Sequence, residues 1–462
     1  MSGHASQANA NSRSPFRSRS AAAGLRVAWP MLLRVCLLCT AIAVWPEPSR
    51  AVPSYARQMN MPCNGCHVQF PVLNEFGRQF KMGGYTMIAQ PTISEEDAKQ
   101  RKLLDLPLAS LLSVMFQTDL TYLDKRQPGT ANTDVQLPDQ ASVFFAGRIA
   151  PQIGAFVQMT YSGAEDKFGI DNADLRYANR AELFSKPVLW GLSVNNNPTS
   201  TDPWNSTPAW GYPFVSSPSA PTPAASPLIE GGIAQQVAGV TAYSNFNELL
   251  YTEAGVYRAA PLGVDRPLTR DGTVSGVAPY WRAALHHVWG STGVMLGHFG
   301  MIVRQDPDSG GPENRFTDLG VDLQIQQPIG SDVVQLLARW VNERATWGVG
   351  NAEHGHTQLD ELRLAATYYL GQRYGFTLGP FATFGSKDTV LFAPDSVSGS
   401  ANGRPNSDGI VAELSYNPWM NTRFTAQYTS YFEFNGRSQN YDGAGRDAWN
   451  NNTFFLQAWF AW

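Results

Sequence analysis

Most of the chain after Pro107 alternates apolar and polar residues with a period of two, the pattern of a β-strand with one apolar and one polar face. The clearest examples cover residues 317–326, 334–343, 361–370 and 423–433. One face of each strand is compatible with lipid, whereas the other carries charges of both signs, such as Asp322 and Arg339. A half-buried strand of a soluble β-domain also alternates, so the connections between strands must separate the two fold classes.

The connections favour a transmembrane barrel. About sixteen strands are predicted, an even number as in single-chain bacterial barrels. Short turns such as Gly290–Ser291 and Gly371–Gln372 alternate with long loops, which are residues 124–140, 196–235, 259–277, 347–358, 387–406 and 435–451. We therefore expect residues 107–462 to form a mainly β, transmembrane antiparallel barrel of the porin type, in contact with outer-membrane lipids. The first strand, Leu108–Leu120, would rise from the periplasm because a long loop follows it.

Two further features agree with this prediction. The last strand places Phe454, Leu456, Ala458, Phe460 and Trp462 on one face, which resembles the terminal strand by which outer-membrane barrels are recognised for insertion. The segment 196–235 is the third external loop, which in general porins commonly folds inward. Here it would either line a path for an electron donor or remain a flexible external loop.

The pattern before Pro107 is helical. Pro71 suits a first helical turn, Leu73, Phe76 and Phe80 recur at helical spacing, and Gly83–Gly84 would end this helix. Ser94 with Asp97 resembles a capping box and predicts a second helix through about Leu104. Residues 52–106 are thus predicted to be a small α-helical module.

The amino-terminal 51 residues have the features of a signal peptide. Arg13, Arg17, Arg19 and Arg26 form a basic region, and residues 35–45 form an apolar run too short to span a bilayer. Residues 49–51 suit cleavage, and an uncleaved anchor is the alternative. No apolar run after Ala51 approaches the ~18 residues of a membrane-spanning helix. The net charge of −4 gives no sign of nucleic-acid binding.

The segment Cys63-Asn-Gly-Cys66-His67 carries the chemistry. Two thiols at this spacing bond covalently to the vinyl groups of a haem, and the following histidine becomes the proximal iron ligand. We therefore predict one covalent haem c on the module. The alternative is a redox dithiol of the thioredoxin type, but that site needs a βαβ context, which is not visible in the sequence.

The distal iron ligand is left open by the sequence. A methionine would raise the potential relative to a second histidine, and Met87 is favoured over Met82. Met59 and Met61 are also close, but Met61 is too near Cys63 in the chain to be expected on the opposite haem face. His286 and His298 on the predicted strands are further candidates. A metal site at Glu353, His354, His356 and Asp360 is weighed against an ordinary hydrated loop.

Three segments together resemble a known family. These are Val52-Pro-Ser-Tyr-Ala-Arg-Gln, the Cys63–His67 motif, and Phe70-Pro with Phe76-Gly-Arg-Gln-Phe80-Lys-Met-Gly-Gly-Tyr85. They resemble the fused monohaem cytochrome c–porins of iron-oxidising bacteria, closely over about residues 53–87 and in architecture and length beyond.

The resemblance implies a haem module that plugs the barrel, either inside it or on its periplasmic side. Electrons would pass from an extracellular donor, typically Fe(II), to a periplasmic cytochrome c or copper protein, which amounts to an iron:cytochrome c oxidoreductase activity. The alternatives are a conduit with another donor or acceptor, and a passive porin with an accessory haem module.

Overall fold

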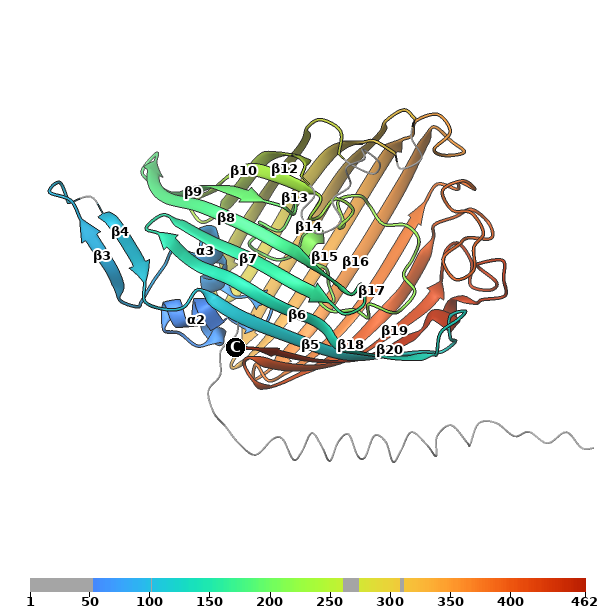
Figure 1. The fold of residues 1–462 in the computed structure, drawn as a ribbon, viewed down its shortest axis with the longest axis horizontal. Coiled ribbons are helices and arrows are strands. Elements are labelled where there is room, and N and C mark those ends of the chain that lie inside the picture. The colour runs from blue at the N-terminus through green and yellow to red at the C-terminus, as the bar shows by residue number, and fades with distance from the viewer. Residues whose placement is uncertain (1–52, 101, 261–273, 308–310) are drawn as a thin grey trace, which may run out of the picture. The chain divides into compact units, whose positions relative to one another are not determined.

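The computed structural model describes residues 53–100, 102–260, 274–307 and 311–462, and the predicted signal peptide lies outside these residues. In the described part of the chain, sixteen strands pair in sequence order to form one closed barrel (Figure 1). Each strand is antiparallel to its neighbours. The last strand closes the barrel on the first, with Leu456 opposite Leu120. The prediction of a mainly β, sixteen-stranded antiparallel barrel is therefore confirmed.

The barrel strands are β5 (Leu112–Leu123), β6 (Thr133–Ala150), β7 (Ile153–Ser162), β8 (Lys167–Leu183), β9 (Lys186–Asn195), β10 (Val237–Phe246), β11 (Leu250–Ala259), β12 (Ala278–Trp289), β13 (Thr292–Gln305), β14 (Asn314–Ile329), β15 (Asp332–Thr346), β16 (His356–Leu370), β17 (Tyr374–Gly385), β18 (Ser407–Trp419), β19 (Thr422–Glu433) and β20 (Thr453–Ala461). Short 3-10 turns lie at η2 (Pro208–Trp210) and η3 (Ala448–Asn451) in the loops. The first strand begins four residues later than Leu108, at Leu112.

The two faces of the strands are those that the alternation predicts. On β15, Val334 and Trp340 are exposed, whereas Gln335 and Arg339 are buried. On β20, Phe454 is exposed and Gln457 is buried. Successive strand side chains point to opposite faces, so the apolar set forms an outer surface and the polar set fills the interior.

The connections differ between the two ends of the barrel. One end carries short turns, and the other carries the longer connections, which join β5 to β6, β9 to β10, β11 to β12, β13 to β14, β15 to β16, β17 to β18 and β19 to β20. The alternation has one exception. Residues 163–166, between β7 and β8, are a short connection at the end where the other loops are long. The segment at 196–236 is the third connection at this end, as predicted.

The amino-terminal module departs from the helical prediction. It contains α2 (Pro53–Met59), a 3-10 turn η1 (Cys63–Gly65) and α3 (Glu75–Met82), but also two hairpins, β1 (His67–Gln69) with β2 (Val72–Leu73) and β3 (Thr92–Glu96) with β4 (Lys102–Pro107). Among the described residues, no helix has the length and apolar character needed to cross a membrane.

Both predicted helices need correction. Helix α3 begins at Glu75, because Asn74 caps it by accepting a bond from the Gly77 amide at 2.9 Å, and Pro71 lies in the preceding hairpin. Its predicted end at Gly83–Gly84 is confirmed, with Gly84 at a φ of +65°. The predicted helix from Ser94 is wrong. Asp97 instead accepts a bond from the Lys99 amide at 2.9 Å, which stabilises the turn between β3 and β4.

Candidate haem-binding site

The Cys63–His67 motif folds as one tight turn. The Cys66 amide donates to the Cys63 carbonyl at 3.1 Å, and β1 begins at His67. The amino-terminal end of α3 packs directly on this turn, since a Cβ on Gly77 would lie 2.2 Å from the Cys66 carbonyl oxygen. The Asn74 amide also donates to that carbonyl, at 2.9 Å. Helix α3 therefore fixes the conformation of the motif.

The motif opens on a cavity of about 300 Å³ between the module and the barrel wall. Cys63, Cys66 and His67 all line it. Most of the remaining lining is apolar or aromatic, and includes Tyr55, Ala56, Phe70, Leu73, Phe80, Tyr85, Val114, Met115, Phe144, Phe156, Phe214, Trp459 and Ala461. An apolar pocket with a few polar groups that converge on it is the usual form of a cofactor site.

The protonation state of His67 suits ligation of a haem iron. Burial lowers the pKa of His67 to about 4, with the backbone groups of Pro71 and Val72 acting in the opposite direction. The imidazole is therefore neutral at pH 7, the form that binds a metal. Burial, with a smaller contribution from Cys63, raises the pKa of the Cys66 thiol to about 11. The two cysteines are not joined by a disulfide. The residues present thus fit a covalent haem.

The structure places the candidate distal ligands in different surroundings. Met82 is buried against barrel residues such as Leu189 and Tyr243. Met87 offers its carbonyl oxygen to Gln58 at 2.6 Å. Neither side chain is among the described residues that line the cavity, whereas Met59 and Met61 are. Met61 lies over Gly65, where a Cβ would be 2.2 Å from the Met61 sulfur.

The candidate histidines do not reach this cavity. The Nε2 atom of His286 lies 3.4 Å from the Glu75 carboxylate at the start of α3, and neither residue lines the cavity. His298 is on the exposed face of β13, where its Nε2 accepts a bond from the Trp281 indole at 3.2 Å. His354 is 3.7 Å from Asp388, and His356 contacts Thr346. The described residues contain no group of three or more His, Cys, Asp or Glu side chains placed to hold a metal ion, so Glu353, His354, His356 and Asp360 are not brought together as a metal site.

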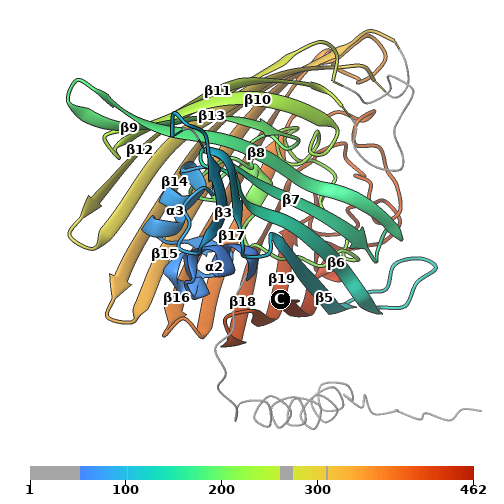
Figure 2. The same ribbon diagram turned by 60° about the vertical axis from the view of Figure 1, so that its left-hand side comes forward.

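The module is bound to the inner wall of the barrel at the short-turn end. Figure 2 shows α2 and α3 at this end. Arg78 donates to Gln326 on β14 at 2.8 Å, and Tyr85 donates its hydroxyl to Asp174 on β8 at 3.0 Å. Asn64, within the motif, donates to Gln372 in the turn after β16 at 3.1 Å. These contacts come from widely separated strands, so the module lies across the barrel mouth.

The third loop meets the module inside the barrel. Lys81 on α3 donates to the carbonyl oxygens of Ser200 and Asp202 at 2.9 and 2.6 Å and to the Asn205 side chain at 3.1 Å. Asn205 in turn donates to the carbonyl of Pro71 at 3.2 Å. The alternative in which this loop folds inward therefore agrees with the structure.

A buried ion-pair cluster holds the same loop to the wall. Arg282 on β12 contacts Asp322 on β14 at 2.8 Å and Asp202 in the loop at 3.1 Å, and all three side chains are 0% exposed. Farther along the loop, Glu230 pairs with Arg339 at 2.7 Å. Charges buried this deeply are stable only in partnership, so each pair fixes the loop position.

The sequence did not identify Arg78 and Lys81 as the residues that dock the module. The sequence feature that could have indicated this role is the spacing of the two cations, three positions apart in the predicted helix that follows the motif. Long cationic side chains usually reach solvent from such positions, so their burial depends on partners that lie far along the chain.

No family model and no curated protein matches this chain. Among solved structures, the chain is similar to Salmonella typhi OmpF in complex with daunomycin, with 12% identity, a TM-score of 0.46 and coverage of 76% of this chain and 97% of that one. It is also similar to a loop L8 deletion mutant of Vibrio cholerae OmpT (12% identity, TM-score 0.44, 76% and 98% covered) and to the Acinetobacter baumannii channel DcaP (12% identity, TM-score 0.44, 76% and 96% covered). We infer no function from similarities at this level.

Proposed function

We propose that this protein is an outer-membrane barrel that binds one haem c and passes electrons from an extracellular donor to a periplasmic cytochrome c or copper protein. The observation that carries the proposal is the convergence of Cys63, Cys66 and His67 on one largely apolar cavity against the barrel wall. The donor implied by the family resemblance is Fe(II). When bound, the haem supplies a one-electron ferric–ferrous couple.

The chain's own residues have separate tasks in this proposal. Cys63 and Cys66 would hold the haem through thioether bonds to its vinyl groups, and neutral His67 would supply a nitrogen ligand to the iron. The aromatic lining, including Phe70, Phe80 and Trp459, excludes water and so influences the reduction potential. Each electron passed leaves one Fe(III) outside and reduces one ferric cytochrome or cupric protein in the periplasm, with no atom transferred.

The outer surface supports a membrane location. The exposed residues on the barrel include many large apolar side chains, among them Leu285, Leu296, Leu378 and Phe432. Soluble proteins rarely expose an apolar surface of this extent, whereas a lipid-facing barrel requires it. A closed barrel also pairs the backbone groups of every strand, as a bilayer demands.

The second candidate function is a passive porin with an accessory haem. The sixteen-stranded closed barrel favours it, since barrels of this size commonly enclose an aqueous channel. The conduit is supported instead by the contacts between the third loop and the module, in which Lys81 donates to the Asp202 carbonyl and Asn205 donates to the Pro71 carbonyl. A conduit that uses another donor or acceptor would share the same site.

Haem attachment is tested directly on the purified protein. We expect a haem stain that survives denaturing electrophoresis in the wild type and disappears in a Cys63→Ala, Cys66→Ala variant. His67→Ala should retain the stain but lose the normal low-spin spectrum. A stain that persists in the double cysteine variant would refute the covalent site.

Electron transfer is tested in proteoliposomes with the long loops facing outward. Fe(II) added outside should reduce the haem, while small sugars should cross poorly. Deletion of residues 52–105 should raise sugar leakage and remove the redox activity together. Rapid passage of sugars through the intact protein would favour the passive porin. If Fe(II) leaves the haem oxidised while another donor reduces it, the Fe(II) assignment is wrong but the conduit is retained.

A further inference from the structure

A buried lysine lies in the wall of the cavity that Cys63, Cys66 and His67 line. Among the described residues of this lining, Lys81 is the only lysine or arginine. It is 5% exposed, and its Nζ atom lies 4.2 Å from the centroid of the Trp210 ring, which also lines the cavity. A positive charge is therefore built into a cavity whose wall is otherwise mostly apolar or aromatic.

The hydrogen-bond partners of this ammonium group are all neutral. It donates to the carbonyl oxygens of Ser200 and Asp202 at 2.9 and 2.6 Å and to the side-chain oxygen of Asn205 at 3.1 Å. Within the part of the chain that the structure describes, no carboxylate forms an ion pair with Lys81. Neutral acceptors satisfy the N–H groups, but a buried charge is stabilised further by a charge of opposite sign.

The acidic side chains on this side of the barrel already have cationic partners. The Asp174 carboxylate, which lines the cavity, is 2.6 Å from Arg176. The Asp202 carboxylate points to Arg282 at 3.1 Å, although its carbonyl oxygen accepts from Lys81. An anionic group on a ligand in the cavity would therefore find Lys81 without a competing ion pair.

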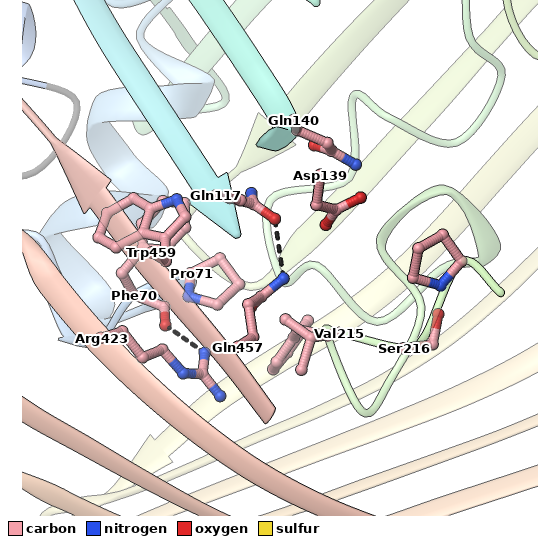
Figure 3. A pocket seen from close by; sticks show the side chains of 12 residues that line it. Phe70, Pro71, Gln117, Asp139, Gln140, Val215, Ser216, Arg423, Gln457 and Trp459 are labelled. Carbon is pink, nitrogen blue, oxygen red and sulfur yellow. Dashed lines mark hydrogen bonds between the residues drawn. The ribbon is translucent and has the colours of Figure 1, made fainter. Parts of the chain in front are cut away.

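An adjoining cavity of about 320 Å³ contains another cation, Arg423 (Figure 3). Phe70 lines both cavities, so an anionic group has two cations within reach of this region. The Arg423 guanidinium, however, is paired with Glu413 at 2.5 Å and donates to the Phe70 carbonyl oxygen at 3.0 Å. The Asp139 carboxylate also lines this second cavity and would repel an anion. Lys81 is therefore the better partner for an anionic group.

We propose that Lys81 binds a propionate carboxylate of the haem. A haem c carries its propionate groups on the edge of the ring opposite the vinyl groups, and a buried carboxylate needs a charged or hydrogen-bonding partner. The Asn205 side chain also lines the cavity and is the acceptor that the propionate would replace, because the other two acceptors are backbone carbonyl oxygens. The ion pair would turn the propionate edge toward the third loop. This role of Lys81 rests on the proposed function, which supplies the covalent haem.

Solid-state NMR on the haem-loaded protein in lipid measures the contact directly. The propionate carboxyl carbons are labelled with carbon-13 by feeding carboxyl-labelled 5-aminolevulinate, lysine is labelled with nitrogen-15, and the haem is kept reduced. We expect a dipolar coupling between a propionate carbon and a lysine Nζ atom. Lys81→Arg, which keeps the charge but removes the labelled nitrogen, should abolish this coupling and keep the haem stain. Lys99→Arg, at an exposed position between β3 and β4, is the matched control and should keep the coupling.

The midpoint potential gives a second readout. Lys81→Gln removes the charge but keeps a donor for the carbonyl oxygens of the third loop. The unpaired propionate should then shift the ferric–ferrous equilibrium toward the ferric form by roughly tenfold, which corresponds to about 59 mV. Lys81→Arg should keep a potential close to that of the wild type, and so should the control Lys99→Gln.

The outcomes separate this role from the proposed function. Wild-type protein that stains for haem but shows no coupling would overturn the role of Lys81 and leave the haem site standing. A coupling that persists in Lys81→Arg would also overturn it. A wild-type protein without a haem stain would overturn both proposals. Heat-modifiable migration in electrophoresis checks that each variant keeps its barrel, and the coupling in the wild type decides the matter if Lys81→Gln fails to fold.

Discussion

Replacement of Arg282 by methionine tests whether the buried ion pairs hold the third loop inside the barrel. The substitution keeps the length and removes the charge, so Asp202 and Asp322 remain buried and unpaired with it. Removal of one partner from a buried ion pair typically costs about 3–5 kcal/mol. At 1.4 kcal/mol per tenfold change, local opening of the loop would increase by roughly 10²- to 10³-fold or more.

Hydrogen exchange measures this opening, because Asp202 itself accepts bonds from the amides of Trp204 and Ser206 at 3.1 and 2.8 Å. We expect the protection factors of these two amides to fall by about 10²-fold in Arg282→Met. This is the smaller of the two values above, because the Glu230–Arg339 ion pair still holds the loop to the wall. Arg258→Met, at an exposed position of β11, is the matched control. Unchanged protection in Arg282→Met would refute the idea that this cluster holds the loop.

Three further predictions concern the module. Gly77→Ala should reduce haem attachment, measured as haem stain per amount of protein, because the added Cβ would lie 2.2 Å from the Cys66 carbonyl oxygen. Gly83→Ala is the control and should have a smaller effect, because its Cβ would lie 3.1 Å from the nearest atom. Met59→Leu or Met61→Leu should lower the midpoint potential if a methionine is the distal ligand, while Met82→Leu should leave the spectrum unchanged because Met82 packs on the barrel. A changed spectrum in Met82→Leu or in Met87→Leu would instead identify that methionine as the distal ligand. Tyr85→Phe should weaken docking by about 1–3 kcal/mol, through loss of the buried bond to Asp174, measured as faster exchange of the Tyr85 amide.

The barrel could be predicted from the sequence because its determinant is local. A period of two along each strand assigns every side chain to a face, and successive hairpins then pair neighbours in the chain. The same reasoning failed at residues 94–104, where the periodicity is short and the Asp97 turn decides between a helix and a hairpin. A capping-box pattern was therefore a weaker signal than the turn.

The candidate site was only partly accessible from the sequence. The motif identifies Cys63, Cys66 and His67 because their spacing is itself the chemistry. The direction of a nearby methionine side chain is not encoded by its distance along the chain, so Met82, Met87, Met59 and Met61 could not be separated. The contact of Asn205 with Pro71 joins residues 134 positions apart, and no local pattern predicts it.

The polar contents of the lumen distinguish two uses of the same fold. A channel for small solutes needs mobile water and charges that remain hydrated along its path. Here Arg176, Arg282 and Arg339 are fully buried and are committed to partners on the wall, the module or the third loop. Burial of a charged side chain opposes folding unless the charge is paired. The paired side chains inside this barrel are therefore held in fixed positions, and they occupy space that water would fill in an open channel. Fixed geometry contributes little to solute diffusion, but it is required to hold a redox centre at a constant distance from its donor and acceptor. In the proposed function, this fixed interior would hold the haem at a constant position.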